Sequence, residues 1–255
     1  MKIAYIGIDL FYPALEKLYN LGCEIVEIFT CEVDNVCEFN LQIYAFAEKH
    51  NIPISKIPIC REDIKRLIDK GCDAAICGGY YFKIPHDTSL PIVNIHPSLL
   101  PIGRGSWPMA QSILWRHKSS GVTIHKIAEG FDTGDILMQE EFALDNDETH
   151  QTFMDKANTK LVQMMPELIE NFGSLYANAR PQGEGEYWKA PTKEDYTITS
   201  DMTVTQADLI LRAFYGYECI YKHQKTSCTI IGGRAVLSNH LPDNEFVLSD
   251  GYIIF

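Results

Sequence analysis

Residues 2–8 read KIAYIGI, and this stretch decides the fold class. Its apolar side chains run on without the alternation of a half-exposed strand, so we expect a strand that is buried on both faces, as in a parallel sheet. Residues 24–30, 73–79 and 91–96 have the same character, and helical patterns separate these strands. This order predicts an α/β fold with a Rossmann-like, mostly parallel sheet and helices on both faces.

Helical patterns are expected at 13–21, 40–50, 61–71, 108–115, 147–173 and 204–214. In the long helix, we expect Asp147 or Thr149 to cap the first turn and Pro166 to bend the axis. Two later strands are expected at 121–127 and 136–144.

Composition narrows the class of protein. The 255 residues carry 22 Lys and Arg against 34 Asp and Glu, a net charge of −12, which disfavours nucleic acid as a partner. No apolar run approaches the roughly 20 residues that cross a bilayer, and the N-terminus does not resemble a secretory signal. We therefore expect a cytoplasmic protein that does not use a membrane. The eight cysteines lack zinc-finger spacing, so we expect buried thiols and no metal.

Two short motifs carry the chemistry: NIHPSLLP at 94–101 and FDTGDIL at 131–137. Alternate residues of a strand point to the same side, so Asn94 and His96 share one face. Pro97 ends the strand and leaves His96 at its carboxyl end, where open α/β sheets bind ligands. Taken singly, His96 reads as a structural histidine, Asp132 as a turn residue and Asn94 as a strand-end residue.

Together these motifs resemble the folate-dependent formyltransferase family, which includes methionyl-tRNA formyltransferases and amino-sugar N-formyltransferases. The family pattern Asn-x-His-x-Ser-Leu-Leu-Pro is met at 94–101, and its Asp-x-Gly is met by Asp132 and Gly134. The resemblance runs through most of residues 1–170. It implies a catalytic domain over 1–180, a linker over 181–196 and a small C-terminal α+β or β subdomain over 197–255, similar to a truncated family C-terminal domain.

The resemblance also implies a reaction: a formyl group passes from 10-formyltetrahydrofolate to an amine, without a metal. Asn94, His96 and Asp132 are the implied catalytic residues. An amine that attacks the formyl carbon creates an oxyanion, to which the Asn94 amide can donate and protonated His96 can add charge. Asp132 can orient His96, favour its imidazolium form and help to move the proton of the amine.

Two segments are the implied folate contacts. The main chain of Phe82, Lys83 and Ile84 corresponds to the family loop on one side of the pterin, although the aromatic run at 80–82 could equally be a core cluster. The second segment closes the other side of the pterin and consists of Ala128, Glu129, Gly130 and Phe131.

Ser98, Arg104 and Trp107 are the implied acceptor-binding residues. Arg104 could pair with an anionic group or be an ordinary loop arginine, and Trp107 could stack on a ring or anchor its loop. We expect His86 and His125 to be structural and Cys77 not to be catalytic.

More than one kind of amine acceptor is compatible with the sequence. A phosphate-binding glycine-rich loop after the first strand is missing, and the C-terminal tail is short and acidic, so we favour an amino-sugar nucleotide or another small amine over methionyl-tRNA. A formyltetrahydrofolate hydrolase ranks lower, since the chain starts at the first strand without the regulatory domain usual there. A silent binding protein ranks lowest because the triad is intact. A homodimer is left open.

Overall fold

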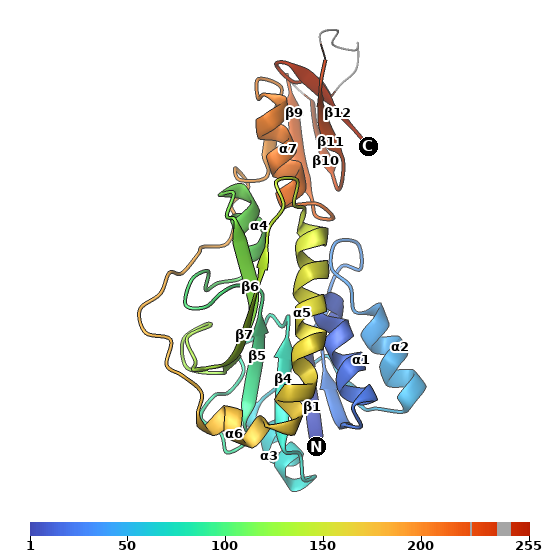
Figure 1. Cartoon of the computed structure of the whole chain (residues 1–255). Coiled ribbons are helices and arrows are strands. Elements are labelled where there is room, and N and C mark those ends of the chain that lie inside the picture. The colour runs from blue at the N-terminus through green and yellow to red at the C-terminus, as the bar shows by residue number, and fades with distance from the viewer. Residues whose placement is uncertain (225, 239–245) are drawn as a thin grey trace. The chain divides into compact units, whose positions relative to one another are not determined.

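The computed structural model describes residues 1–224, 226–238 and 246–255 (Figure 1). These residues form two compact units. The first consists of residues 1–104, 121–142 and 156–187, and the second of residues 105–120, 143–155 and 188–255. The second unit thus takes two segments from within the stretch that we predict as the catalytic domain.

A seven-stranded sheet forms the centre of the first unit, in the order β3-β2-β1-β4-β5-β6-β7. Pairing is parallel from β3 through to β5, and β6 joins β5 antiparallel. The strands are β1 (Lys2–Gly7), β2 (Glu24–Phe29), β3 (Ile54–Ser55), β4 (Ala74–Gly78), β5 (Ile92–His96), β6 (Ser119–Lys126) and β7 (Ile136–Ala143). The predicted fold class, a Rossmann-like and mostly parallel sheet, is confirmed, whereas the short β3 was not predicted.

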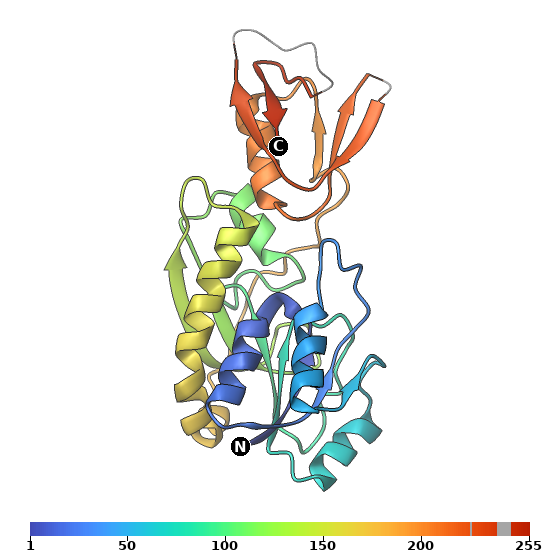
Figure 2. The same cartoon turned by 90° about the vertical axis from the view of Figure 1, so that its right-hand side faces the viewer.

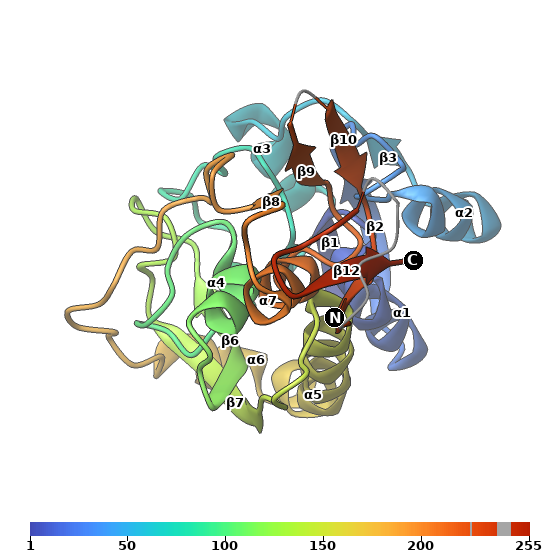
Figure 3. The ribbon, with the colours of Figure 1, turned by 90° about the horizontal axis from the view of Figure 1, so that it is seen from above.

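Helices cover both faces of this sheet. Figure 2 shows α5, α1 and α2 side by side in front of the strands, and Figure 3 shows α3 on the opposite side. This division follows from right-handed crossovers that first move outward from β1 and then return to β4. The helices of the first unit are α1 (Tyr12–Asn20), α2 (Leu41–His50), α3 (Arg61–Asp69), most of α5 (His150–Glu170) and α6 (Phe172–Ala177).

The central strands β1 and β4 are largely apolar because both faces are covered. On the α3 side, Ile64 and Leu67 pack with Ala4 and Ile6 of β1 in one buried cluster. Each fully buried Leu or Ile side chain contributes roughly 1.5–3 kcal/mol relative to exposure. This packing fixes the carboxyl edge of the sheet, where β4 and β5 end.

The long helix differs from its prediction at both ends. It starts at His150 rather than at 147, and Thr149 caps it, since its Oγ1 accepts from the backbone nitrogen of Thr152 at 3.1 Å. The helix continues through Pro166 and ends at Glu170, and a separate short helix, α6, follows. The prediction of one helix over 147–173 was therefore wrong beyond residue 170.

The second unit has its own core. Helix α7 (Val204–Ala213) and helix α4 (Pro108–Leu114) contribute Leu211 and Ile113 to a cluster with Tyr221. The strands form a three-stranded sheet, β8 (Thr197–Thr199), β9 (Cys219–His223) and β10 (Thr226–Ile230), and a pair, β11 (Arg234–Leu237) and β12 (Gly251–Ile254). Within the described ranges of the chain, no helix combines the length and apolarity needed to cross a membrane.

Candidate active site

The pairing of β5 with β6 brings the first polar side chains together. In this antiparallel ladder Asn94 lies opposite His125, and His96 lies opposite Thr123. Opposite residues of a ladder project to the same face. Four polar residues therefore share one side of a strand pair in which Ile95 and Ile124 take the other positions.

The turn between β6 and β7 carries Asp132 to this face. Its backbone is left-handed, with φ of 54°, a conformation that Asp and Asn tolerate better than most residues. Two residues later the chain passes so close to β6 that a Cβ on Gly134 would lie 1.9 Å from the Lys126 carbonyl oxygen. The Asp-x-Gly motif thus combines a side chain for the site with a glycine that the close approach requires.

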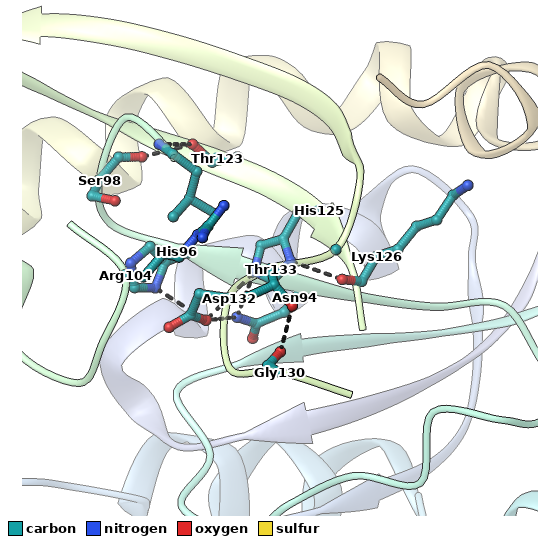
Figure 4. Close-up of polar contacts among 12 residues, drawn as sticks. Asn94, His96, Ser98, Arg104, Thr123, His125, Lys126, Gly130, Asp132 and Thr133 are labelled. Carbon is teal, nitrogen blue, oxygen red and sulfur yellow. Dashed lines mark hydrogen bonds and ion pairs between the residues drawn. The ribbon is translucent and has the colours of Figure 1, made fainter. Parts of the chain in front are cut away.

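Asp132 is the centre of the cluster that results (Figure 4). Its Oδ1 lies 3.4 Å from Asn94 Nδ2 and 3.6 Å from His96 Nδ1. His125 Nε2 also lies 3.6 Å from the same oxygen. The side chains of His96 and Asp132 are 6% and 14% exposed, so the carboxylate and imidazole interact in a largely water-excluded place. The structure therefore brings the three predicted catalytic residues together on one carboxylate.

Hydrogen bonds fix the orientation of Asn94. His125 Nδ1 lies 2.8 Å from the Lys126 carbonyl oxygen, which can only accept, so this nitrogen carries the proton in neutral His125. Its Nε2 then accepts from Asn94 Nδ2 at 3.1 Å. The second N–H of the Asn94 amide points to Asp132. Both amide protons are engaged, so the donation to an oxyanion that we expected requires one of them to be released.

Burial shifts the pKa of His96. Its Nε2 donates to the Gly103 carbonyl oxygen at 2.7 Å, and Nδ1 faces Asp132. Desolvation lowers the pKa of His96, and this effect outweighs Asp132 and the Gly103 carbonyl, which raise it. Asp132 acts in the opposite direction and favours the imidazolium form, as expected. Burial penalises a charge on His96 more than one carboxylate offsets it, so the charge that we expect His96 to add requires it to take up a proton during the reaction.

The predicted acceptor-binding residues are occupied with contacts inside the protein. Ser98 is buried, and its hydroxyl donates to the Ile102 carbonyl oxygen at 2.8 Å, which closes the loop after β5. The Arg104 guanidinium donates to the side-chain oxygen of Gln182 from Nε at 3.1 Å and Nη2 at 2.9 Å. In the second unit, the Trp107 ring packs edge-on against Tyr217 at 4.6 Å.

The predicted folate-contact residues lie in two loops at the carboxyl edge of the sheet. After β4, the Phe82 ring is 41% exposed and meets Tyr80 edge-on at 5.5 Å, whereas Ile84 is buried in the core. After β6, Glu129, Gly130 and Phe131 are exposed, and Ala128 is half-buried. Lys83 is exposed as well. The alternative reading as a core cluster thus holds for Tyr80, which packs against the core, whereas Phe82 reaches solvent.

The sequence analysis did not place His125 in this cluster, since we expected it to be structural. Its signal was present in the pattern: Thr123 and His125 alternate along β6 as Asn94 and His96 do along β5. What the sequence did not provide was the register that sets the two pairs opposite each other.

Cys77 lies close to this cluster of side chains. Cys77 is buried beside Asn94 in the ladder, and desolvation raises the pKa of its thiol far above the usual range. Across the residues that the structure describes, no group of three or more His, Cys, Asp or Glu side chains is arranged to hold a metal ion.

Comparison with known proteins shows to which family this chain belongs. The model of the formyl transferase family matches residues 64–169, which include both motifs. A methionyl-tRNA formyltransferase of Rickettsia bellii (strain RML369-C) is 30% identical over 206 residues, which cover 76% of this chain and 68% of the relative. The chain belongs to the formyl transferase family.

Solved structures in this family share the fold at lower identity. A sugar N-formyltransferase from Shewanella sp. superposes with a TM-score of 0.70 at 15% identity, covering 93% of this chain and 99% of that one. A sugar 3N-formyltransferase, solved in the presence of dTDP and 5-N-formyl-THF, gives a TM-score of 0.68 at 19% identity, covering 99% and 96%. The matches to methionyl-tRNA formyltransferases of Ehrlichia ruminantium (strain Gardel) and Sulfurimonas denitrificans span 58% and 76% of the length of those relatives.

Proposed function

We propose that this formyl transferase moves a formyl group from 10-formyltetrahydrofolate to a primary amine. The observation that carries the proposal is the convergence of Asn94, His96 and His125 on one carboxylate oxygen of Asp132. The solved sugar 3N-formyltransferase with 5-N-formyl-THF supports a folate donor, because its fold is shared along nearly the whole chain.

In the proposed reaction, the amine nitrogen attacks the formyl carbon, and the bond from that carbon to N10 of the folate breaks. Asp132 accepts the proton that the amine loses. The neutral Nδ1 of His96 can then share this proton with the carboxylate, 3.6 Å away, and become an imidazolium beside the developing oxyanion. A positioned acid–base group typically contributes 10²- to 10⁴-fold. The proton reaches N10 of the leaving tetrahydrofolate.

We propose that the donor's pterin lies between the loops that contain residues 82–84 and 128–131. The exposure of Phe82 and Phe131 supports this placement, because flat heteroaromatic rings bind well against exposed aromatic side chains and main-chain groups. A structure with bound tetrahydrofolate tests it. A pterin bound away from both loops would contradict it.

For the acceptor, we propose a small amine, with an amino-sugar nucleotide as the leading class. Asp9, two residues after the end of β1, supports the view that no phosphate cradle lies there. Its carboxylate accepts from the backbone nitrogens of Gln42 and Ile43 at 2.9 and 3.0 Å, and so places a negative charge in that loop. The net charge of −12 disfavours the phosphate backbone of tRNA.

Methionyl-tRNA is the second candidate acceptor, because the matched relatives carry that name and one match extends over 87% of this chain. A transfer screen separates the candidates. Purified protein and 10-formyltetrahydrofolate are incubated with amino-sugar nucleotides, methionyl-tRNA, small amines or no amine, and tetrahydrofolate release is measured. Release of tetrahydrofolate only in the presence of methionyl-tRNA would select the second candidate. Release of tetrahydrofolate without any amine would indicate a hydrolase. Binding of folate without release of tetrahydrofolate under any condition would indicate a silent binding protein.

A further inference from the structure

Residues 180–187, which we predicted to belong mostly to a linker, lie along the active-site loops of the first unit. Backbone hydrogen bonds hold the segment at two places. Ile136 and Arg180 exchange a pair at 2.8 and 3.0 Å, and Glu186 donates to Pro101 at 3.1 Å while it accepts from Arg104 at 3.0 Å. The approach is close, because a Cβ on Gly185 would lie 2.4 Å from the Pro101 carbonyl oxygen. The segment is therefore part of the structure around the site.

Gln182 reaches from this segment to the turn that carries Asp132. Its Nε2 donates to the Asp132 carbonyl oxygen at 2.9 Å and to the Gly134 carbonyl oxygen at 2.6 Å. Its Oε1 accepts twice from Arg104, at 3.1 and 2.9 Å. Both donors and both acceptor positions of the amide are used. A flipped amide would set oxygen against two carbonyls and NH₂ against a guanidinium, so this orientation is fixed.

These contacts join two groups that touch His96. Arg104 follows Gly103, whose carbonyl oxygen accepts from His96 Nε2 at 2.7 Å. Gln182 holds the backbone of Asp132, whose carboxylate faces His96 Nδ1. Asp132 keeps a left-handed φ of 54°, which costs a non-glycine residue on the order of 1 kcal/mol and needs support from its surroundings.

We propose that Gln182 is a positioning residue for formyl transfer: its amide holds the Asp132 turn in place, and Arg104 holds the amide. This inference rests on the proposed function and assigns Arg104 a structural partner rather than an acceptor anion. Gln182 does not touch the reacting atoms. It acts through the position of the Asp132 carboxylate, where a displacement of about 1 Å can cost 10²-fold in rate.

The central variant is Gln182→Met, which keeps the length of the side chain and removes both donors and the acceptor. We expect kcat to fall about 10- to 100-fold, with little change in KM for 10-formyltetrahydrofolate or the amine, because only the transition state needs the carboxylate in place. Gln182→Glu keeps an acceptor for Arg104 but loses the donors, and we expect it to be as slow. The matched control is Glu184→Gln, an exposed side chain of the same segment, which should behave like the wild type.

Arg104 and Gln182 together form a clamp on the Asp132 turn, and Arg104→Met tests the Arg104 half of it. If Arg104 acts through Gln182, this variant lowers kcat, and the double variant with Gln182→Met is no slower than Gln182→Met alone. If Arg104→Met instead raises KM for the amine and leaves kcat unchanged, Arg104 binds the acceptor. That result would overturn the proposal that Arg104 holds the Gln182 amide.

A second readout does not depend on turnover. Imidazole NMR signals of His96 and His125 in the free protein report the position of Asp132, so Gln182→Met should shift both and Glu184→Gln neither. If the wild type transfers no formyl group while the signals shift, the proposed function fails and the clamp stands. If the wild type is active, and Gln182→Met retains its kcat and its imidazole signals, the clamp is refuted.

Discussion

Asn94 and His125 face each other across the β5–β6 pair, and the Asn94 amide nitrogen lies 3.1 Å from His125 Nε2. The contact depends on the tautomer of His125, because its Nδ1 must donate to the Lys126 carbonyl oxygen for Nε2 to accept. A histidine buried under the site thereby sets which way the amide of a proposed catalytic asparagine points.

His125→Leu should therefore slow transfer without unfolding the protein. The Asn94 amide would lose the acceptor that orients it, and we expect kcat to fall about tenfold, the equivalent of about 1.4 kcal/mol in the barrier. His125→Gln offers a side-chain oxygen to Asn94 and should retain more activity than His125→Leu. Steady-state rates at saturating folate measure both. Equal rates for His125→Leu and the wild type would show that Asn94 needs no partner on β6.

Asp132→Asn removes the charge at the centre of the cluster and keeps a residue type that tolerates the left-handed backbone. We expect a loss of about 10²- to 10⁴-fold in kcat, the usual contribution of a positioned acid–base group, with folate affinity and melting temperature nearly unchanged. Single-turnover transfer and a thermal melt give the two numbers. Near-normal turnover in a folded variant would refute the role proposed for the carboxylate.

Much of the fold could be read from local pattern. The unbroken apolar runs at 2–8 and 73–79 identified buried parallel strands, because helices on both faces leave no polar side. The two-residue β3 could not be found this way, since Ile54 and Ser55 have no periodicity to recognise and pair only through the path of β2. The end of α5 at Glu170 also could not be predicted from the sequence, because the helical spacing of apolar residues continues past this residue.

The site shows where sequence reasoning stops. Asn94 and His96 could be placed on one face by alternation, and the resemblance supplied Asp132. His125 and Gln182 could not be placed, because their contacts come from strand register and from the return of a segment 50 residues beyond Asp132. The lowered pKa of His96 is likewise a product of burial, which a single sequence does not quantify.

Gly134→Ala tests the geometry of the Asp132 turn. The added Cβ would lie 1.9 Å from the Lys126 carbonyl oxygen, so the turn must move and carry Asp132 with it. We expect a melting temperature lower by several degrees and a loss of activity larger than that instability explains. Gly173→Ala is the control, because a Cβ added at this position has nothing within 4 Å. An alanine in α6 should leave the stability of the fold unchanged or raise it by up to about 1 kcal/mol. Unimpaired activity of Gly134→Ala would show that the turn adapts.

The buried His150 gives the second unit a pH-dependent stability. It lies at the start of α5 among aromatic rings, 4.9 Å from the ring centroid of Tyr217 and 6.2 Å from that of Trp107. Among the described residues, its Nε2 has no hydrogen-bond partner. Desolvation lowers the pKa of His150 to about 4. The folded state therefore resists a proton that the unfolded chain takes up below about pH 6.5.

Because the pKa of His150 is lower in the folded than in the unfolded state, it favours the folded state above about pH 6.5. This contribution to the free energy of unfolding, about 3 kcal/mol in total, is lost as the pH falls from 6.5 to 4. His150→Leu should flatten the fall in the free energy of unfolding by up to about 1.4 kcal/mol per pH unit in that window. Urea titrations followed by tryptophan fluorescence suit the measurement, since Trp107, Trp115 and Trp188 all lie in the second unit. The exposed His86→Gln should keep the wild-type slope. An equal slope in His150→Leu and wild type would mean that the buried imidazole is protonated in the folded state, and that a group on a neighbouring element compensates its charge.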